Sequence, residues 1–295
     1  MQSIVNNRFC LLPVILLISS LALTSCLDSS TDTNQGASKN LLEQAQSYAD
    51  FDTFVDIISD TELNTTIANE GPLTLLVPTN DAFDALPSGT LESLTDEQLI
   101  DILSYHVIEQ IIDLNQLSAE ETFTSMQGDN IFFVISNDSL YINGSNYVGG
   151  VGASNGVLYA TDQVLFPDAY LDVTGLVHKR KQLSELDKSI DNTGLASTLE
   201  DTSSAYTIFA PSNTALQNAE LSADTLKYHV VSGKLLSQDF SSSQTYTTLN
   251  GKELSVEVSG SSVTINGEAA VTTADIEGVN GVVHIIDTAL APPSE

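Results

Sequence analysis

Apolar residues recur along the chain with two spacings, which predict helices followed by strands. Thr95 and Gln98 form a capping box that predicts the start of a helix. The predicted helix carries Leu99, Ile102 and Leu103 on one face, at the i, i+3 and i+4 positions. Beyond it, short apolar runs separated by Asn, Asp, Ser and Gly predict hairpin strands, at residues 132–135 and 140–142.

The same order of elements occurs a second time. Ser222 precedes a helix that carries Leu226 and Val230 on one face, and strand-like runs follow at 254–258 and 263–265. Helices followed by a run of hairpin strands indicate an α+β fold, because α/β folds alternate strand and helix.

Three sequence blocks are repeated in the same order, with spacings that differ by a few residues. The repetition predicts a duplicated domain with changes in loop length. The paired blocks are residues 74–83 and 207–216, residues 103–108 and 226–231, and residues 155–162 and 280–287.

These blocks resemble the fasciclin domain family, which shows a T-x-F-A-P-[ST]-N opening block, a Tyr-His pair and an N-G-V-[IV]-H closing strand. The second copy matches the closing block fully, whereas the first has Tyr159 where the family has His and Leu76-Val77 in place of Phe-Ala. The resemblance covers residues 40–292. It implies two fasciclin domains, 40–167 and 168–292, each a β-sandwich or wedge with packed helices, and a binding and adhesion role without catalysis.

The amino terminus resembles the export signal of a bacterial lipoprotein. Arg8 precedes an apolar stretch that is too short to span a bilayer as a helix, so we expect a removable signal peptide at residues 1–25. Residues 23–26 resemble a lipobox, which predicts that Cys26 is acylated. The alternative, a disulfide between Cys10 and Cys26, requires that the signal be retained. Residues 26–39 are polar and predict a flexible tether.

By the same resemblance, Leu27 in place of Asp favours the outer membrane, and both the periplasmic and the external face remain open. The chain has 39 acidic and 9 basic residues, a net charge of −30. This excess disfavours nucleic acid and anionic headgroups as partners, so the expected membrane contact is the lipid alone. The acidity fits solubility in salt better than attraction to cations. The basic run 178–181 is interpreted as a solvated helix face, with an anion site as the alternative.

Two Tyr-His pairs, Tyr105-His106 and Tyr228-His229, are the first candidates for a site. Each His lies on the apolar face of its helix, so we expect buried, neutral imidazoles with a structural role. The family resemblance also implicates the Tyr-His region in receptor contact. The His residues lack the spacing of zinc ligands, and no cofactor is expected.

Asp275-Ile276 is the second candidate, because in animal fasciclin proteins an Asp-Ile pair just before the closing strand takes part in integrin recognition. The first copy has Gly150-Val151 at this place. The alternative is that Ile276 packs in the core while Asp275 caps a turn, and we favour it.

Two further motifs point to other chemistry. Ser154 lies in a G-x-S-x-G sequence, but the hydrolase motif needs a helix after the Ser, and the pattern here predicts a strand. Asp129-Asn130 and Asn137-Asp138 offer oxygen ligands for calcium, although they lack the loop pattern of a calcium site and fit turns better.

Together these patterns predict a monomeric, lipid-anchored protein that uses two modules for multivalent contact with a protein or polysaccharide. Capture of a glycan or lipid ligand in the envelope is the alternative. A serine hydrolase at Ser154 is the third and weakest hypothesis.

Overall fold

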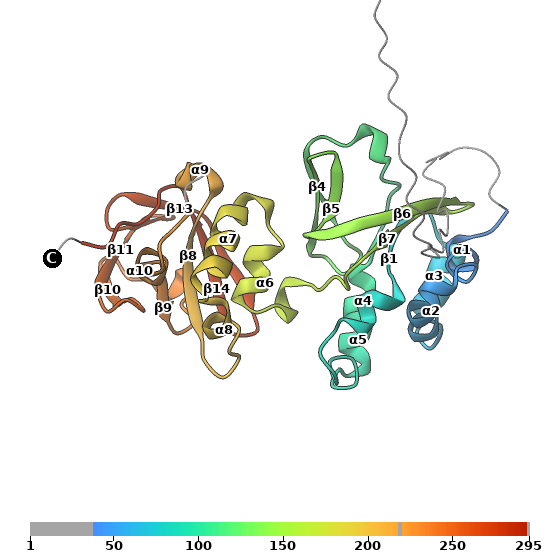
Figure 1. The fold of residues 1–295 in the computed structure, drawn as a ribbon, viewed down its shortest axis with the longest axis horizontal. Helices are drawn as coiled ribbons and strands as arrows, with labels where there is room; N and C mark the ends of the chain where they lie inside the picture. Colours follow the sequence, from blue (N-terminus) through green and yellow to red (C-terminus); the bar gives the residue numbers. More distant parts are fainter. Residues whose placement is uncertain (1–37, 218–219, 294–295) are drawn as a thin grey trace, which may run out of the picture.

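Each half of the chain builds one seven-stranded sheet in the computed structural model, which describes residues 38–217 and 220–293 (Figure 1). The strand orders are β2-β1-β7-β6-β5-β4-β3 and β10-β11-β12-β13-β14-β8-β9. In each sheet the strand of the opening block pairs in parallel with the strand of the closing block, β1 with β7 and β8 with β14. The two ends of each repeat therefore lie side by side, as a self-contained domain requires.

The first domain places its helices before and around the first two strands of its sheet. The helices are α1 (Leu41–Ala45), η1 (Ala49–Phe51), α2 (Asp52–Ser59), α3 (Leu63–Asn69), α4 (Asn80–Asp84), α5 (Asp96–Tyr105) and η2 (Leu114–Gln116). The strands are β1 (Leu73–Pro78), β2 (Val107–Ile108), β3 (Glu120–Thr124), β4 (Asn130–Ser136), β5 (Ser139–Ile142), β6 (Ser145–Ala153) and β7 (Gly156–Thr161).

The second domain repeats this order. Its helices are η3 (Asp168–Tyr170), α6 (Val173–His178), η4 (Lys181–Leu183), α7 (Ser184–Thr193), α8 (Ala196–Leu199), α9 (Asn213–Leu216), α10 (Ala223–Tyr228) and η5 (Ser237–Asp239). Its strands are β8 (Tyr206–Pro211), β9 (Val230–Ser232), β10 (Gln244–Thr247), β11 (Glu253–Ser259), β12 (Ser262–Ile265), β13 (Ala269–Gly278) and β14 (Gly281–Ile286).

Local signals in the sequence are confirmed where they are strongest. Thr95 accepts from the backbone of Gln98, whose side chain accepts from the backbone of Thr95, so the predicted capping box begins α5. Ser222 caps α10, and its side chain accepts from the backbone N–H of Thr225. The four predicted hairpin runs are β4, β5, β11 and β12.

The hydrophobic interior is divided by domain. The described residues form four buried clusters, two in each domain, and no cluster mixes residues of both. Each sheet separates a cluster that packs against its helices from a cluster enclosed by its hairpins. Each repeat therefore has a complete core, and the prediction of two tandem domains with an α+β fold is confirmed.

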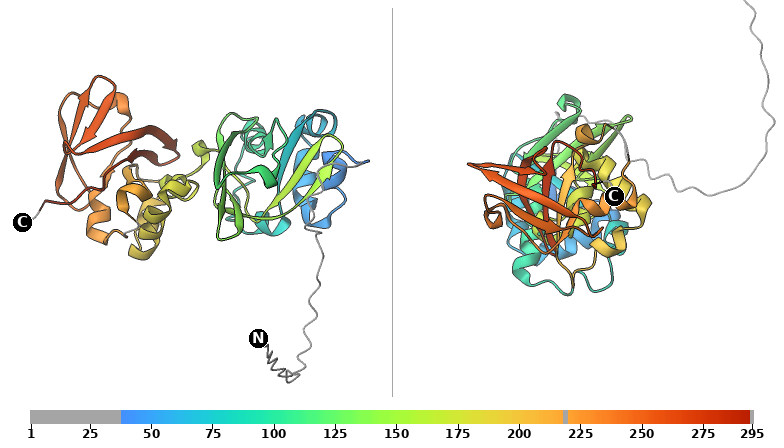
Figure 2. Two further views of the ribbon diagram at one scale, coloured as in Figure 1. Left: turned by 90° about the horizontal axis from the view of Figure 1, so that it is seen from above. Right: turned by 90° about the vertical axis from the view of Figure 1, so that its left-hand side faces the viewer.

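The two domains follow one another along the longest axis of the molecule (Figures 1 and 2). A short segment after β7 leads through η3 into α6, and the end of α6 lies toward the first domain. This arrangement brings the basic run at residues 178–181 to the junction between the domains.

Candidate functional site

The Tyr-His pair of the first domain lies at the buried end of α5. The Tyr105 hydroxyl donates to the backbone oxygen of Asn130 at 2.6 Å and accepts from the Asn143 side chain at 2.8 Å. His106 Nδ1 lies 2.8 Å from the oxygen of Ile102, and its Nε2 accepts from the backbone N–H of Leu165 at 3.1 Å. The ring therefore carries its proton on Nδ1 and joins the helix to the segment that follows β7.

The second pair repeats this network atom for atom. Tyr228 donates to the oxygen of Glu253 and accepts from Asn266, at 3.0 and 2.9 Å. His229 Nδ1 lies 2.8 Å from the oxygen of Thr225, and its Nε2 accepts from the N–H of Leu290 at 2.9 Å. The two Tyr side chains therefore occupy equivalent surroundings, as a duplicated domain requires.

Burial decides the chemistry of both imidazoles. His106 and His229 are fully buried, and burial lowers the pKa of each to about 4, against the opposing effect of the hydrogen bond to a backbone oxygen. Both rings are neutral at pH 7. Tyr105 and Tyr228 are also buried, so the geometry fits the expected structural role of the two pairs, and receptor contact through the Tyr-His region stays a prediction.

Asp275 lies on a bulge of β13 with a φ of +60°, a conformation that Asp tolerates better than most residues. Its carboxylate accepts from the backbone N–H of Ser237 at 2.7 Å and from the Ser237 hydroxyl. Its own N–H donates to Nδ1 of His284, whose Nε2 donates to the oxygen of Leu235 at 2.8 Å. Ile276 is 8% exposed and packs in the core. The favoured structural interpretation fits this geometry, and part of the Asp275 carboxylate remains open to solvent.

The first domain replaces this arrangement by another. Tyr159 stands where the second domain has His284, and its hydroxyl donates to the oxygen of Ile112. A Cβ atom on Gly150 would come within 2.5 Å of the Tyr159 ring. The Gly and the Tyr therefore fit one another, and the first domain has no counterpart of the Asp275 carboxylate.

Two Asn residues that open the closing blocks perform a structural role that sequence analysis did not assign. Asn155 accepts from the N–H of Leu41 at 2.9 Å and donates to the oxygens of Ile67 and Glu70. Asn280 makes the same three contacts in the second domain, with Val173, Leu199 and Asp201. Each Asn ties the start of the first helix and the end of a later helix to the closing strand.

The basic run was interpreted as a solvated helix face, and this is wrong for its two central residues. Lys179 and Arg180 are 3% and 7% exposed, because they lie against the first domain. A helical pattern shows which face of a helix is apolar, but it carries no information about a neighbouring domain that covers the polar face.

Other candidate chemistry finds little support in the geometry. Ser154 lies in the turn between β6 and β7, so the strand–turn–helix of a hydrolase elbow is not formed there. Asn137 and Asp138 have positive φ values at the turn between β4 and β5, as the turn interpretation expects. Within residues 38–217 and 220–293, no group of three or more His, Cys, Asp or Glu is placed to hold a metal ion.

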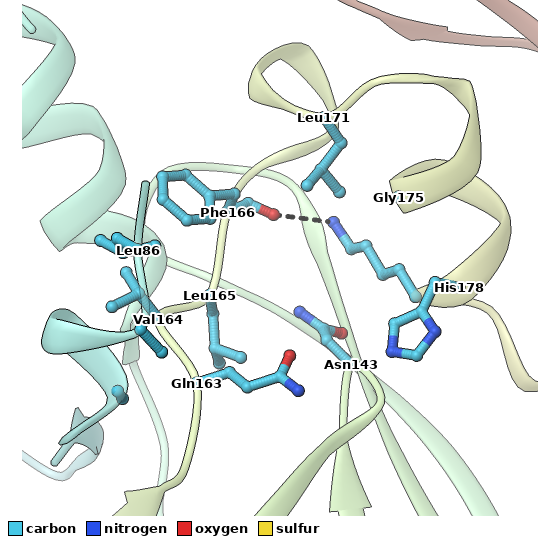
Figure 3. Close-up of a pocket in the computed structure, with 12 residues that line it drawn as sticks. Leu86, Asn143, Gln163, Val164, Leu165, Phe166, Leu171, Gly175 and His178 are labelled. Atoms are coloured by element: carbon cyan, nitrogen blue, oxygen red, sulfur yellow. Dashed lines mark hydrogen bonds between the residues drawn. The ribbon is translucent and has the colours of Figure 1, made fainter. Parts of the chain in front are cut away.

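At least three hollows are lined by described residues of both domains, and two of them bear on function. One, of about 380 Å³, is lined by apolar side chains such as Leu86, Val164 and Leu171 and by the polar Gln163 and His178 (Figure 3). The other is a groove of about 510 Å³, and acidic residues of both domains line it: Asp129, Asp168, Asp275 and Glu277.

The fold and these repeated networks define a protein built from two copies of one α+β module. The fasciclin domain family matches the chain twice, at residues 49–167 and 181–292. Since the matches cover most of the chain, the protein belongs to the fasciclin domain family. Fasciclin domains are known from cell adhesion proteins.

Similar proteins support this assignment. Periostin from Homo sapiens is 29% identical over 236 residues, which are 77% of this chain and 28% of periostin. The transforming growth factor-beta-induced protein ig-h3 from Sus scrofa is 30% identical over 272 residues, 88% of this chain and 38% of that protein. The chain thus spans about a third of the length of these relatives.

A smaller relative and a solved structure complete the comparison. The cell surface glycolipoprotein MPT83 of Mycobacterium tuberculosis H37Rv is 38% identical over 104 residues, 34% of this chain and 46% of that protein. The structure of a FAS1 domain pair from the insect cell adhesion molecule Fasciclin I aligns with a TM-score of 0.55 at 19% identity. The alignment covers 82% of this chain and 97% of that one. At this identity the likeness supports the fold alone.

Proposed function

We propose that the protein is a lipid-anchored adhesion protein, held at the outer membrane by Cys26 and turned toward the exterior. The observation that carries the proposal is the pair of fasciclin domains, since relatives with this domain are adhesion or cell-surface proteins. Two linked domains suit weak contacts, because linkage raises avidity without a tight single site.

The anchor is supported by the lipobox-like sequence at residues 23–26, which lies outside the described residues. A similar protein, MPT83 of Mycobacterium tuberculosis, is a cell surface glycolipoprotein. Among the helices that the structure describes, none is long and apolar enough to cross a membrane. A single acyl chain binds a membrane only marginally, so stable attachment through Cys26 requires more than one chain or a second membrane contact.

We place the contact with the partner at the acidic groove between the domains. Asp275 and Glu277 line this groove, with side chains 36% and 50% exposed, and the Glu277 carboxylate also pairs with Lys234 at 2.8 Å. Ile276 packs in the core below the bulge and lines the groove with the 8% of its surface that is exposed. Exposed carboxylates fit a partner that offers amino or hydroxyl groups, either a protein or a polysaccharide.

A deletion strain tests the adhesion proposal. Loss of the gene is expected to reduce attachment to surfaces, and the wild-type chain is expected to restore it. Cys26→Ala is expected to leave the protein off the membrane and attachment unrestored. Asp275→Asn, which can still accept from Ser237, is expected to restore the anchored, folded protein with weaker attachment. Unchanged attachment of the deletion strain on every tested surface contradicts the proposal.

Ligand capture is the second candidate function, favoured by the hollow of about 380 Å³ between the domains. Apolar walls with a few polar groups are typical of small-molecule sites, which occur preferentially at domain interfaces. A rise in melting temperature with one glycan or fatty acid of a panel would support capture, and no rise with any of them would count against it.

A further inference from the structure

Lys179 and Arg180, which we call the basic corner, are held by contacts with the first domain and with the connecting segment. Lys179 Nζ lies 4.7 Å from the centre of the Tyr105 ring, and Arg180 Cζ lies 5.5 Å from the centre of the Phe132 ring. A cation over an aromatic face is attracted by the ring quadrupole, and the attraction grows when water is excluded.

Asp168, in the connecting segment, pairs with both cations of the basic corner. Its carboxylate accepts from Lys179 Nζ at 2.7 Å and from the Arg180 guanidinium. Its backbone N–H donates to the carboxylate of Asp129, in the first domain, at 3.0 Å. Two acidic and two basic side chains thus meet at the junction, and the buried cations are paired, as buried charges must be.

The charge of the first domain explains why these cations come from outside it. Residues 40–167 contain no Lys or Arg among their many Asp and Glu residues. An isolated first domain therefore has no cation to place over Tyr105 and Phe132, and its acidic surface attracts one from a neighbour. The second domain supplies both.

We propose that Tyr105, Asp129 and Phe132 form a docking surface, the exit face, whose partner is the basic corner of the second domain, and that this contact fixes the angle between the domains. Domains joined by a flexible segment move relative to one another by default, so a fixed angle needs a specific contact of this kind. The inference stands independently of the adhesion proposal.

The corresponding residues of the second domain do not form such a surface. Lys252 takes the place of Asp129, since the hydroxyls of Thr248 and Ser125 bond the oxygens of these two residues alike. Ser255 takes the place of Phe132, since each donates its N–H to the equivalent Asn at 2.8 Å. The far end of the second domain thus presents a cation and lacks the aromatic ring.

The near end of the first domain lacks the basic corner as well. Leu41 and Val173 are equivalent, because each donates its N–H to the Asn of its closing block. Counting forward, Ser47 and Tyr48 stand where the second domain has Lys179 and Arg180. The exit face and the basic corner therefore occur together only at the junction between the two described domains. This contact joins these two domains and offers no equivalent surface for adding further copies of the chain.

Beside the basic corner, Gly144 of the first domain and His178 of the second domain lie close together. A Cβ on Gly144, in the turn between β5 and β6, would lie 2.8 Å from Nε2 of His178, at the end of α6. Gly144 has a φ of +85°, which favours Gly. Figure 3 shows His178 beside Asn143 at the polar end of the hollow between the domains.

Spin-label distances across the junction test the proposal. In the full chain with Cys10 and Cys26 replaced by serine, Glu97→Cys and Glu257→Cys place one label on an exposed position of each domain. The unaltered junction is expected to give one narrow distance distribution. The exit-face variant Asp129→Lys with Phe132→Ser is expected to broaden it at least about twofold, because free domains rotate about their linker.

The reciprocal variant Lys252→Asp with Ser255→Phe is the matched control, because it exchanges the same residue types at the far end of the second domain. Its distribution is expected to stay as narrow as that of the parent. The exit-face variant carries the residue types that the second domain has at the equivalent positions, so it is expected to fold, and circular dichroism checks this. A broad distribution in the parent, or equal widths in the parent and the exit-face variant, overturns the proposal.

Discussion

At the scale of single residues, burial and contacts at both ring nitrogens define the state of the two imidazoles of the Tyr-His pairs. Their pKa values lie near 4 because burial disfavours the charged ring. His178 differs, since its hydrogen bond to Asp187 raises its pKa above the usual value. Burial also lowers the pKa of His284, so the surroundings shift the pKa of all four histidines.

The histidine protonation states provide a direct prediction for NMR. At pH 5.5 an unperturbed His is about nine-tenths protonated, because its pKa is about 6.5. The ring signals of His106 and His229 are expected to remain those of neutral imidazole at that pH, whereas the His178 signals are expected to be those of the cation. Protonated shifts for His106 and His229 in the folded protein at pH 5.5 would contradict the buried networks.

The same pKa values predict how stability depends on pH. Since the folded-state pKa lies below the unfolded-state value, protons bind preferentially to the unfolded chain. The free energy of unfolding is therefore expected to be independent of these two groups above pH 6.5. It is expected to fall between about pH 6.5 and pH 4, by about 3 kcal/mol for each ring. Urea unfolding across this range measures the change.

Burial of these histidines could be predicted from sequence because it follows from a local spacing on a helix. The partners of their Nε2 atoms could not. Leu165 and Leu290 follow their histidines by 59 and 61 residues, and only the folded chain brings them together. The burial of Lys179 was missed for a similar reason, because its covering surface belongs to another domain.

At the scale of elements, the closing strand organises each domain. It pairs in parallel with the opening strand, begins with a Gly and is preceded directly by an Asn. A Cβ on Gly156 would lie 2.1 Å from the oxygen of Leu73, and one on Gly281 would lie 2.0 Å from the oxygen of Tyr206. Gly is required there because the neighbouring backbone leaves no room.

Replacement of the buried Asn should weaken its domain strongly. Asn280→Ala removes the acceptor of the Val173 N–H and the donor to the oxygen of Leu199, leaving both without their side-chain partner. We expect a loss of about 2–4 kcal/mol in unfolding free energy, because each orphaned buried polar group costs about 1–3 kcal/mol. Chemical denaturation measures it. Asn192→Ala, at an exposed position, is the control and should change stability by less than about 0.5 kcal/mol.

An Asn280→Ala variant as stable as the control would contradict the structural role of this residue.

The hairpins β4–β5 and β11–β12 were predicted from turn residues and apolar runs, which are local signals. The parallel pairing of β1 with β7 joins strands that are distant in sequence, and no local pattern specifies it. The resemblance to a known family, rather than periodicity, supplied the expectation of a complete fold for each repeat.

At the scale of the whole molecule, charge governs how the two domains sit together. The net charge of −30 opposes close approach of the domains, since like charges repel. The basic corner places two of the nine Lys and Arg residues at the junction, where they meet acidic and aromatic groups. The pair is thereby expected to present its surfaces at a fixed spacing, which favours simultaneous contact with an extended partner.

Adhesion itself can be measured without cells. Beads that carry the folded chain, coupled through residue 26 in place of the lipid, are allowed to settle on a panel of polysaccharide and protein surfaces and are then exposed to rising flow. The account predicts that these beads withstand higher flow than beads carrying the same chain after denaturation, on at least one surface. Equal detachment of both kinds of bead on every surface would contradict an adhesive role.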